Sequence, residues 1–262
     1  MSLTSGGKRK DGGIAETVRV ILQAFVIAIV FRTFLFQPFN IPSGSMKETL
    51  LVGDYLFVSK FSYGFSHYSF PLSPPWFSGR IWGAAPARGD IAVFRFPKDD
   101  SVDYIKRVIG LPGDRIQMID GTLQINGQAV ARERIEDFVE TDPSGRLRPS
   151  SPGDDGTTRR SRRWRETLPN GVSYTTLSLD GIGPYANTQV YEVPPGHYFM
   201  MGDNRDNSSD SRILSGVGYV PFENFIGRAQ VIFFSVAEGA HAWELWRWPW
   251  VVRWRRLFTM AR

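Results

Sequence analysis

One apolar run near the N-terminus constrains this chain more than any other feature. From Val20 to Phe36 the residues are almost all apolar, and only Gln23, Arg32 and Thr33 interrupt them. As a helix this run would be about 26 Å long, close to the roughly 30 Å hydrocarbon core of a bilayer. Arg32 lies near one end, where its long side chain can reach the headgroups. We predict a transmembrane anchor over residues 15–37.

A buried core helix and a cleaved secretory signal are the alternatives to an anchor. A secretory signal needs a small-residue cleavage site after its apolar region, and the stretch Arg32–Pro38 has none. Basic residues at Lys8–Lys10 and Arg19 precede the run. The positive-inside rule therefore predicts a cytoplasmic tail over residues 1–14 and places the rest of the chain across the membrane. A core helix stays open on sequence grounds.

Beyond the apolar run the hydrophobic period becomes that of β-strands. Short runs of β-branched and aromatic residues, bounded by glycine, proline and aspartate, recur at 54–59, 90–96, 104–109, 115–119, 122–125, 197–201 and 229–234. Asp120-Gly121 and Asn126-Gly127 are typical of hairpin turns. With 42% hydrophobic residues the chain can bury a core. We expect a mostly β fold with one N-terminal transmembrane helix.

Composition divides the β part into three regions. Residues 38–125 together with 185–238 are expected to form the main domain, and 126–184 an inserted β region with an Arg/Ser/Pro-rich loop. The stretch from Thr141 to Gly171 has the composition of a solvated insertion. Residues 239–262 mix tryptophan with arginine, which is typical of a membrane interface, and a packed C-terminal helix is the alternative.

Charge and cysteine content exclude several kinds of partner. The net charge is +5, but the arginines gather at 159–165 and 247–262 rather than on one reading element, so we predict no nucleic-acid partner. The absence of cysteine excludes disulfides, thiolate metal sites and a cysteine nucleophile. The acidic stretch 203–210 departs from the calcium-loop pattern at Arg205. We expect neither a metal nor a cofactor.

A serine-rich motif follows the apolar run directly and reads Asn40-Ile41-Pro42-Ser43-Gly44-Ser45-Met46. Proline fixes φ, and glycine permits a tight backbone that exposes two hydroxyls and a backbone N–H. A simple turn would have the same composition. Ser45 is therefore a candidate nucleophile only if another part of the chain supplies a base.

Lysine is the best candidate for that base. A Ser-His-Asp triad through His197 and Asp203 is conceivable, but the G-x-S-x-G motif is absent. Lys106 lies inside an apolar strand beside Arg107, so the two side chains face opposite ways. Burial lowers the pKa of a lysine, and only the neutral amine accepts a proton. A solvated edge-strand lysine and the rival base Lys47 remain alternatives.

Three motifs together resemble those of bacterial type I signal peptidases, from the apolar run to about Phe234. They are Ile41-Pro42-Ser43-Gly44-Ser45-Met46, Tyr104-Ile105-Lys106-Arg107 with Gly110-Leu111-Pro112-Gly113-Asp114, and Gly202-Asp203-Asn204-Arg205-Asp206-Asn207-Ser208-Ser209-Asp210-Ser211-Arg212. The resemblance implies that Ser45 is the nucleophile and Lys106 the general base. It also implies an oxyanion hole formed by the Ser45 N–H and the Ser43 hydroxyl, and a Ser208 hydroxyl that orients the lysine.

The same resemblance assigns the neighbouring residues. Asp203, Asp210 and Arg212 are expected to be structural, with Asp210 paired to Arg212 and Asp203 to Arg107. The substrate is expected to lie against Ile41, Pro42, Met46, Leu50, Tyr104 and Ile105. Glu48 departs from the family pattern, which often has proline at that position.

The resemblance implies a signal-peptidase-like β domain of coiled antiparallel sheets. It also implies a monomeric serine endopeptidase of the bacterial inner membrane, single-pass, with its catalytic domain on the extracytoplasmic side. Its partners would be the bilayer and the signal peptides of exported preproteins, cut after small-x-small motifs. A self-cleaving Ser-Lys regulator is one rival, against which the anchor argues. A non-catalytic, membrane-tethered β domain that binds lipid or envelope proteins is the other.

Overall fold

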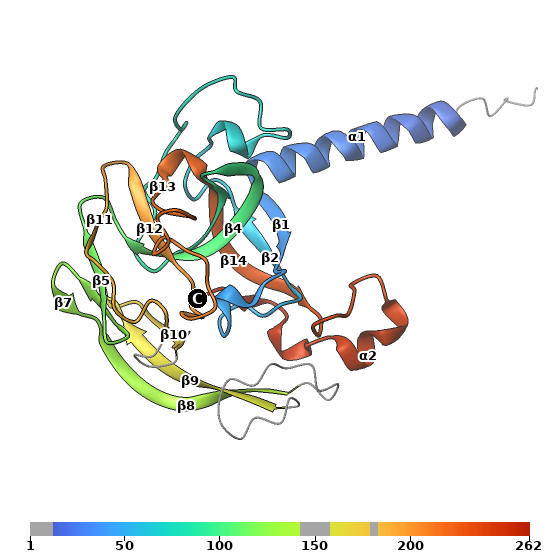
Figure 1. Ribbon diagram of the computed structural model, residues 1–262. Helices are drawn as coiled ribbons and strands as arrows, with labels where there is room; N and C mark the ends of the chain where they lie inside the picture. The colour runs from blue at the N-terminus through green and yellow to red at the C-terminus, as the bar shows by residue number, and fades with distance from the viewer. Residues whose placement is uncertain (1–12, 142–157, 179–182) are drawn as a thin grey trace, which may run out of the picture.

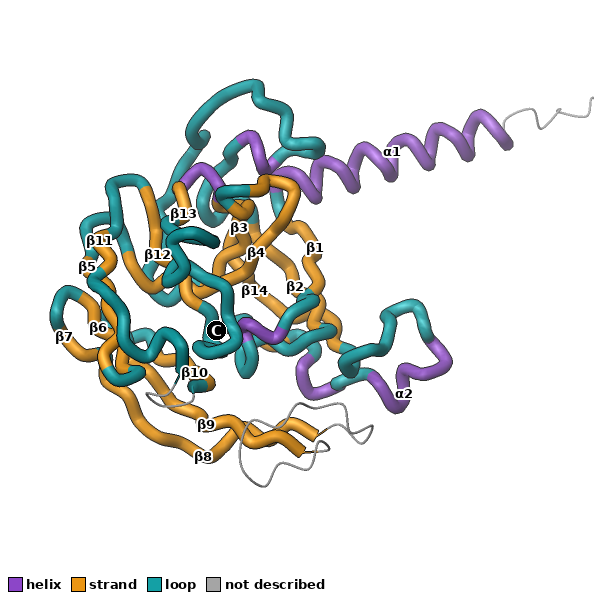
Figure 2. Tube along the Cα trace, viewed as in Figure 1, coloured by secondary structure: helices purple, strands orange, loops and turns teal. Residues whose placement is uncertain are grey.

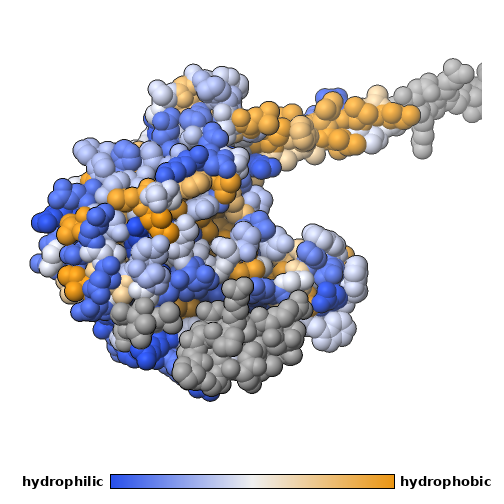
Figure 3. Space-filling view, in the orientation of Figure 1, coloured by the Kyte–Doolittle hydropathy of each residue, from blue (hydrophilic) through white to orange (hydrophobic). Residues whose placement is uncertain are grey.

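A computed structural model of the chain describes residues 13–141, 158–178 and 183–262. Helix α1 (Gly13–Phe34) projects from the β body, and its apolar side chains are exposed (Figures 1 and 3). It is long and apolar enough to cross a membrane, and the rest of the protein does not bury its most apolar stretch. The core-helix alternative is therefore wrong, because a core helix would cover this face with protein. Residues 1–12 of the predicted tail lie outside the described residues.

The helical anchor ends before the predicted position, residue 37. Strand β1 (Phe36–Asn40) follows α1 almost at once and pairs antiparallel with β2 (Asp54–Ser59), with Phe36 opposite Ser59. Pro38 explains the correction, since it has no N–H for a helix and disfavours helical geometry in the residue before it. The short strand fixes the base of α1 to the edge of the main sheet.

An eight-stranded antiparallel sheet forms the main body and confirms the mostly β prediction. Its order is β1-β2-β14-β3-β4-β12-β13, with β15 paired to β14 (Figure 1). The further strands are β3 (Ile91–Phe96), β4 (Asp99–Gly110), β12 (His197–Met201), β13 (Val220–Pro221), β14 (Phe225–Ser235) and β15 (Thr259–Met260). The C-terminal half of β4, from Lys106 to Gly110, is buried, which is the environment predicted for Lys106.

A four-stranded sheet carries the two predicted hairpins. It consists of β5 (Arg115–Ile119), β6 (Thr122–Ile125), β7 (Gln128–Ala129) and β11 (Tyr191–Glu192). Positive φ angles occur at Asp120 (48°) and Gly121 (73°), and again at Asn126 (54°) and Gly127 (79°). Two successive positive φ angles define the type I′ turn, so both turn predictions are confirmed.

The inserted region forms a three-stranded sheet of β8 (Ala131–Thr141), β9 (Thr158–Thr167) and β10 (Ser173–Leu177). Strands β8 and β9 make the long curved ribbon of Figure 2. Within the stretch expected to be a solvated insertion, Thr158–Thr167 form strand β9, most of whose described side chains are exposed or partly exposed. Its Trp164 ring is covered by the guanidinium of Arg132, 3.7 Å from the ring centroid, so arginine is part of the packing here. The loop 142–157 lies outside the described residues.

The inserted sheet shares its apolar core with the main domain. Leu168 and Tyr174 pack in one cluster with Ile109 and Phe199, which belong to β4 and β12. Leu168 is 2% exposed and Phe199 0%. Because close packing in this shared core leaves little room for movement, the inserted sheet is held in a fixed position against the main sheet.

The C-terminal stretch 239–262 contains only short elements, including α2 (Trp248–Val251), and projects from the β body (Figure 1). Its arginines reach inward, since Arg253 donates to Val52 O at 3.0 Å and Arg256 to the buried Asp54 carboxylate at 2.5 Å. Four of its five tryptophans are exposed, Trp250 to 82%, while Trp248 packs against Phe234. The segment thus combines packed arginines with an exposed aromatic surface.

Candidate active site

The serine motif forms a tight loop between β1 and β2. Ser43 is extended (φ −128°, ψ 153°), and Gly44–Met46 make one 3-10 turn. Hydrogen bonds from Gly53 N to Ile41 O (3.0 Å) and from Ile41 N to Asp54 O (2.9 Å) close the base of the loop. The apolar side chain of Met46 is completely buried and anchors the turn in the core. This packing fixes Ser45, which is 8% exposed.

Strand β4 brings Lys106 to the serine. The Lys106 Nζ lies 2.8 Å from Ser45 Oγ and 3.0 Å from Ile105 O. Lys106 is 5% exposed, so its amine is withdrawn from bulk water. Arg107 faces the other way and contacts Asp203, as the alternation of side chains along a strand requires. The alternation along β4 therefore directs Lys106 toward Ser45 and Arg107 toward Asp203.

Burial lowers the pKa of Lys106 from 10.5 to about 8. The carboxylates of Asp210 and Asp203 oppose this shift, and the guanidinium of Arg212 adds to it. A buried ammonium loses hydration, which favours the neutral amine. With this pKa roughly a tenth of the amine is unprotonated at pH 7 and about half at pH 8, and that neutral form can accept a proton from the Ser45 hydroxyl.

The two other predicted serines lie close to Ser45. Ser43 Oγ is 3.4 Å from Ser45 Oγ. Ser208 is 8% exposed, and the hydrogen bonds of Lys106 Nζ go to Ser45 and Ile105 rather than to Ser208. A Cβ placed on Gly202 would lie 2.2 Å from Ser208 Oγ and 2.6 Å from Ser45 O. Glycine at position 202 therefore lets the Ser208 segment approach the nucleophile.

Asn204 contacts the nucleophile loop, and the sequence alone did not predict this contact. Its side-chain amide donates to Gly44 O at 3.0 Å, and its backbone N–H donates to Ser45 O at 3.1 Å. Asn204 stands inside the motif Gly202–Arg212, so its place in the sequence was visible. Its two acceptors were not, because they lie on a loop about 160 residues earlier in the chain.

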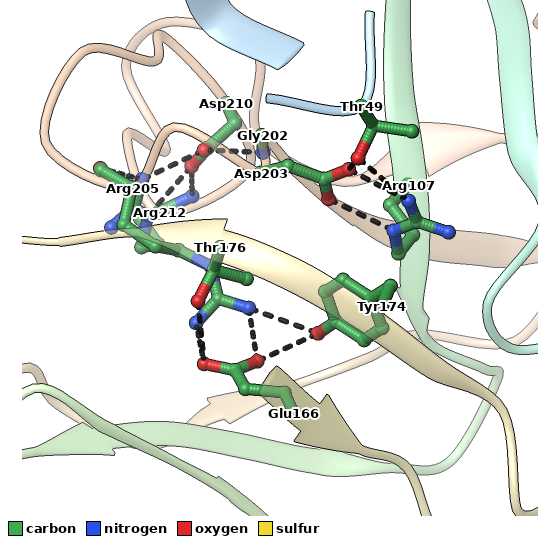
Figure 4. A network of polar contacts seen from close by, with 10 residues as sticks. All are labelled: Thr49, Arg107, Glu166, Tyr174, Thr176, Gly202, Asp203, Arg205, Asp210 and Arg212. Atoms are coloured by element: carbon green, nitrogen blue, oxygen red, sulfur yellow. Dashed lines mark hydrogen bonds and ion pairs between the residues drawn. The ribbon is translucent and has the colours of Figure 1, made fainter. Parts of the chain in front are cut away.

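Both expected ion pairs are present and buried (Figure 4). Arg107 donates to the two oxygens of Asp203 at 2.8 and 2.7 Å, and Thr49 Oγ1 donates to the same carboxylate at 2.6 Å. Arg212 donates to both oxygens of Asp210 at 2.8 Å. Each pair ties the segment 202–212 together or to β4, which supports the structural role expected of these residues.

The rival bases are engaged elsewhere. Lys47 Nζ bonds the carboxylate of Glu140 on β8 and lies 3.5 Å from Glu238. His197 Nδ1 lies 2.9 Å from Pro195 O, and Asp203 is paired with Arg107, so the conceivable Ser-His-Asp triad is not assembled. Within 13–141, 158–178 and 183–262, no group of three or more His, Asp or Glu could hold a metal ion.

The residues expected to line the substrate site differ in exposure. Met46 and Leu50 are completely buried, and Ile41 is 3% exposed in the same apolar cluster. Ile105 packs against that cluster, Tyr104 is partly buried and Pro42 is exposed. These positions place apolar side chains beneath and beside Ser45.

One edge of β4 is open beside the nucleophile. Strand β3 pairs with β4 along Asp103–Arg107, but the ladder with β12 begins only at Arg107. Among the strands of the described ranges, the second edge of Asp103–Lys106 has no ladder partner. An unpaired strand edge can accept an extended peptide.

Glu48, the departure from the resembled pattern, is bound to the inserted sheet. Its Oε1 accepts a hydrogen bond from Arg163 of β9 at 2.7 Å. The side chains of both residues are about one quarter exposed (23% and 24%). The charge at position 48 is therefore compensated across the loop and does not face Ser45 unpaired.

Comparison with known proteins places the chain in a family. The model of the family "Signal peptidase, peptidase S26" matches residues 14–234. A signal peptidase I of Rickettsia typhi is 46% identical over 80% of this chain and 76% of its own length. One of Rickettsia conorii is 46% identical over 81% and 77%. A solved signal peptidase I of Enterococcus faecalis V583 is 27% identical over 55% of this chain and 97% of that chain, with a TM-score of 0.30.

The family match covers the anchor, the serine loop, β4 and the segment 202–212. These are the elements that bring Ser45 and Lys106 together and attach them to a membrane-spanning helix. The chain therefore belongs to the signal peptidase family, peptidase S26, and is a membrane-anchored serine peptidase of that family.

Proposed function

We propose that the protein cleaves signal peptides from exported preproteins with a catalytic pair formed by Ser45 and Lys106. The observation that carries this proposal is the 2.8 Å hydrogen bond between Lys106 Nζ and Ser45 Oγ in a buried site. A nucleophile and a base within hydrogen-bonding distance, withdrawn from water, are what serine proteolysis requires.

The reaction starts with neutral Lys106. Its amine takes the Ser45 proton while Ser45 Oγ attacks the carbonyl carbon of the scissile peptide bond. The resulting oxyanion is held by the Ser45 N–H and the Ser43 hydroxyl. As the tetrahedral intermediate collapses, the Lys106 ammonium gives its proton to the leaving amine, and the signal peptide remains as an ester on Ser45.

Water then releases the signal peptide. Neutral Lys106 takes a proton from the water, whose oxygen attacks the ester carbonyl, and Ser45 Oγ regains a proton as the carboxylic acid leaves. Ser208 is assigned to orient the lysine amine during these transfers. Gly202 lies close to both Ser208 Oγ and the carbonyl of Ser45, which supports a place for Ser208 beside the nucleophile.

The substrate binds as an added strand between the open edge of Asp103–Lys106 and the extended segment Ile41–Ser43. Alternate residues of an extended strand point the same way, so the first and third residues before the cut face the enzyme together. The apolar floor around Ile41 and Ile105 is closely packed. It therefore selects small side chains at both positions.

Membrane attachment sets where the cut occurs. Helix α1 spans the inner membrane with its N-terminus in the cytoplasm, so the catalytic domain faces the extracytoplasmic side. Because enzyme and preprotein share one bilayer, their effective concentration rises. Protease accessibility in sealed vesicles tests this orientation, and protection of residues 55–234 as a cytoplasmic domain would refute it.

The C-terminal segment supplies a second contact with lipid. Its exposed aromatic residues are Trp243, Trp246, Trp250, Trp254 and Phe258, and they stand among arginines that anionic headgroups attract. Bromine-labelled acyl chains in proteoliposomes should quench part of the tryptophan fluorescence. Replacing Trp246 and Trp250 by phenylalanine should reduce that quenching, and unchanged quenching would contradict the contact.

Cleavage of a purified preprotein by the full-length protein is the decisive assay. Ser45→Ala and Lys106→Ala should each abolish cleavage while the thermal unfolding transition remains. If either variant cleaves at the wild-type rate, the catalytic pair is wrong. Absence of cleavage by the unmodified protein would favour the rival reading of a non-catalytic β domain that binds lipid or envelope proteins.

A further inference from the structure

A buried ion pair joins the inserted sheet to the catalytic motif. Glu166 on β9 and Arg205 from the segment 202–212 are 1% and 3% exposed. Arg205 donates from NH1 to Glu166 Oε1 at 3.0 Å and from NH2 to Oε2 at 2.5 Å. The Tyr174 hydroxyl completes the arrangement, donating to Glu166 at 2.8 Å and accepting from Arg205 at 2.9 Å (Figure 4).

The inserted sheet also holds the backbone of this segment. Leu177 N donates to Asp203 O at 2.9 Å, and Arg205 N donates to Leu177 O at 2.8 Å. On the far side of Arg205, its carbonyl accepts a 2.6 Å hydrogen bond from Arg212. Side-chain and backbone contacts thus fix the segment 202–212 on both sides of Arg205.

That segment in turn contacts Ser45 and the residue beside Lys106. Asn204 donates to Ser45 O, and Asp203 pairs with Arg107, the neighbour of Lys106. The charged groups that act on Lys106 are Asp203, Asp210 and Arg212, and all three belong to this segment. The Tyr104 ring, 5.3 Å from the lysine nitrogen, is the aromatic group beside it.

A buried ion pair adds little net stability, because removing two charges from water offsets their attraction. Its value lies in fixing one arrangement of the groups it joins. We propose that Glu166 is a positioning residue for the Ser45–Lys106 pair and acts through Arg205 on the segment 202–212. This inference rests on the proposed function and gives the inserted sheet a part in catalysis.

Removing the Glu166 charge leaves the Arg205 guanidinium buried without its carboxylate. The segment must then shift to hydrate that charge, which loosens Asn204 on Ser45 and admits water beside Lys106. With more hydration the pKa of Lys106 moves from about 8 back toward 10.5. A smaller fraction of the amine is then neutral at pH 8.

The test measures kcat and KM against pH for the full-length protein in phospholipid vesicles, with a preprotein substrate. Glu166→Gln should lower kcat roughly 10–100-fold, with a smaller change in KM, and should move the acidic limb of the profile to higher pH. Glu166→Asp keeps the charge and should recover most of kcat and the position of the limb.

Glu133→Gln is the matched control. Glu133 lies on β8 of the same sheet and pairs with Arg165 at 3.2 Å, but the side chains of this pair are exposed (68% and 52%). Its removal should leave kcat and the acidic limb unchanged. Thermal unfolding of each variant establishes that the protein is folded.

A folded Glu166→Gln variant with wild-type kcat and an unmoved limb overturns the inference, as does a loss of kcat that is equal at every pH. If Glu166→Gln does not fold, the double variant Glu166→Gln/Arg205→Met replaces it, since it removes both buried charges together and still breaks the link to the segment 202–212. An unmoved limb in that folded variant overturns the inference equally. Activity retained by Ser45→Ala or Lys106→Ala would instead overturn the proposed function itself.

Discussion

Two lysines of this protein have nearly the same environment but different partners. Lys106 on β4 and Lys60, directly after β2, are 5% and 3% exposed, and burial lowers the pKa of each to about 8. Lys106 Nζ bonds Ser45 Oγ at 2.8 Å. Lys60 Nζ instead donates to Ser69 O at 2.6 Å, near Arg32 and Arg95 at the base of the anchor.

Burial alone does not make a lysine a general base; the partner of its amine decides. Burial makes a neutral amine available at both positions. A backbone carbonyl has no proton to give, so Lys60 can only hold the loop that contains Ser69. Only at Lys106 does the partner carry a transferable proton and a nucleophilic oxygen. A depressed lysine pKa is therefore a necessary feature of the site but does not identify it.

The largest expected effect is the difference between the two lysines in catalysis. Lys106→Met should lower kcat by ~10³-fold or more, since the proton acceptor is lost, whereas Lys60→Met should change it less than ~10-fold. Preprotein cleavage at saturating substrate measures both. Lys47→Ala is the control for an ion-paired lysine and should resemble Lys60→Met. A loss of kcat in Lys60→Met as large as that in Lys106→Met would contradict the assignment of Lys106 as the base.

A close contact beside Ser45 gives the next effect. In Gly202→Ala the new Cβ would meet Ser208 Oγ at 2.2 Å and Ser45 O at 2.6 Å, so one of them must move. We expect roughly a 100-fold loss of kcat, because small displacements of reacting groups are costly. The cleavage assay measures it, with unfolding as a control. Full activity would show that the segment is less tightly fitted than its contacts indicate.

The pH dependence of cleavage distinguishes the lysines by titration. With Lys106 as the base, kcat/KM should fall about tenfold per pH unit below its pKa of about 8, because only the neutral amine is active. Lys60→Met should leave that limb in place, although Lys60 titrates in the same range. If the acidic limb moves in Lys60→Met, the titrating group is Lys60 and not Lys106.

Stability should respond to both lysines alike, and this is the smallest effect. Each folded-state pKa is about 8 and lies below the ordinary lysine pKa of 10.5, so the unfolded chain binds more protons between these pH values. The free energy of unfolding therefore rises with pH across this window, by at most about 1.4 kcal/mol per unit for each lysine. Lys106→Met and Lys60→Met should each flatten the slope measured by urea unfolding. An unchanged slope would show that the lysine is hydrated in the folded protein.

Local sequence patterns predicted much of this fold. Strands β2, β5, β6 and β12 begin and end at the predicted residues, and both Gly-containing turns have the positive φ angles that their sequences require. Strand β9 was missed because its arginines have the composition of a solvated loop. In the folded ribbon an arginine side chain covers Trp164, a contact that composition does not reveal.

The site divides in the same way. Ser45 and Lys106 were candidates from a serine-rich turn and an apolar strand, and the resemblance of their motifs and of the motif 202–212 to type I signal peptidases gave them their expected roles. Met46 and Leu50, expected beside the substrate, prove to be completely buried core residues. Asn204 and Glu166 had no local signal, since each acts on a partner far away in the sequence.

The sequence by itself predicted the apolar helix, several of the strands and both Gly-containing turns, because each depends on the chemistry of a few neighbouring side chains. It pointed to Ser45 and Lys106 as the catalytic pair only through the resemblance of three motifs to type I signal peptidases. Only the tertiary structure decided which buried lysine meets a serine, and which carboxylate holds the segment beside it. Burial and hydrogen bonding depend on ångström-scale distances between segments that are remote in the chain. Lys60 and Lys106 are alike until the sheet places Ser45 beside only one of them.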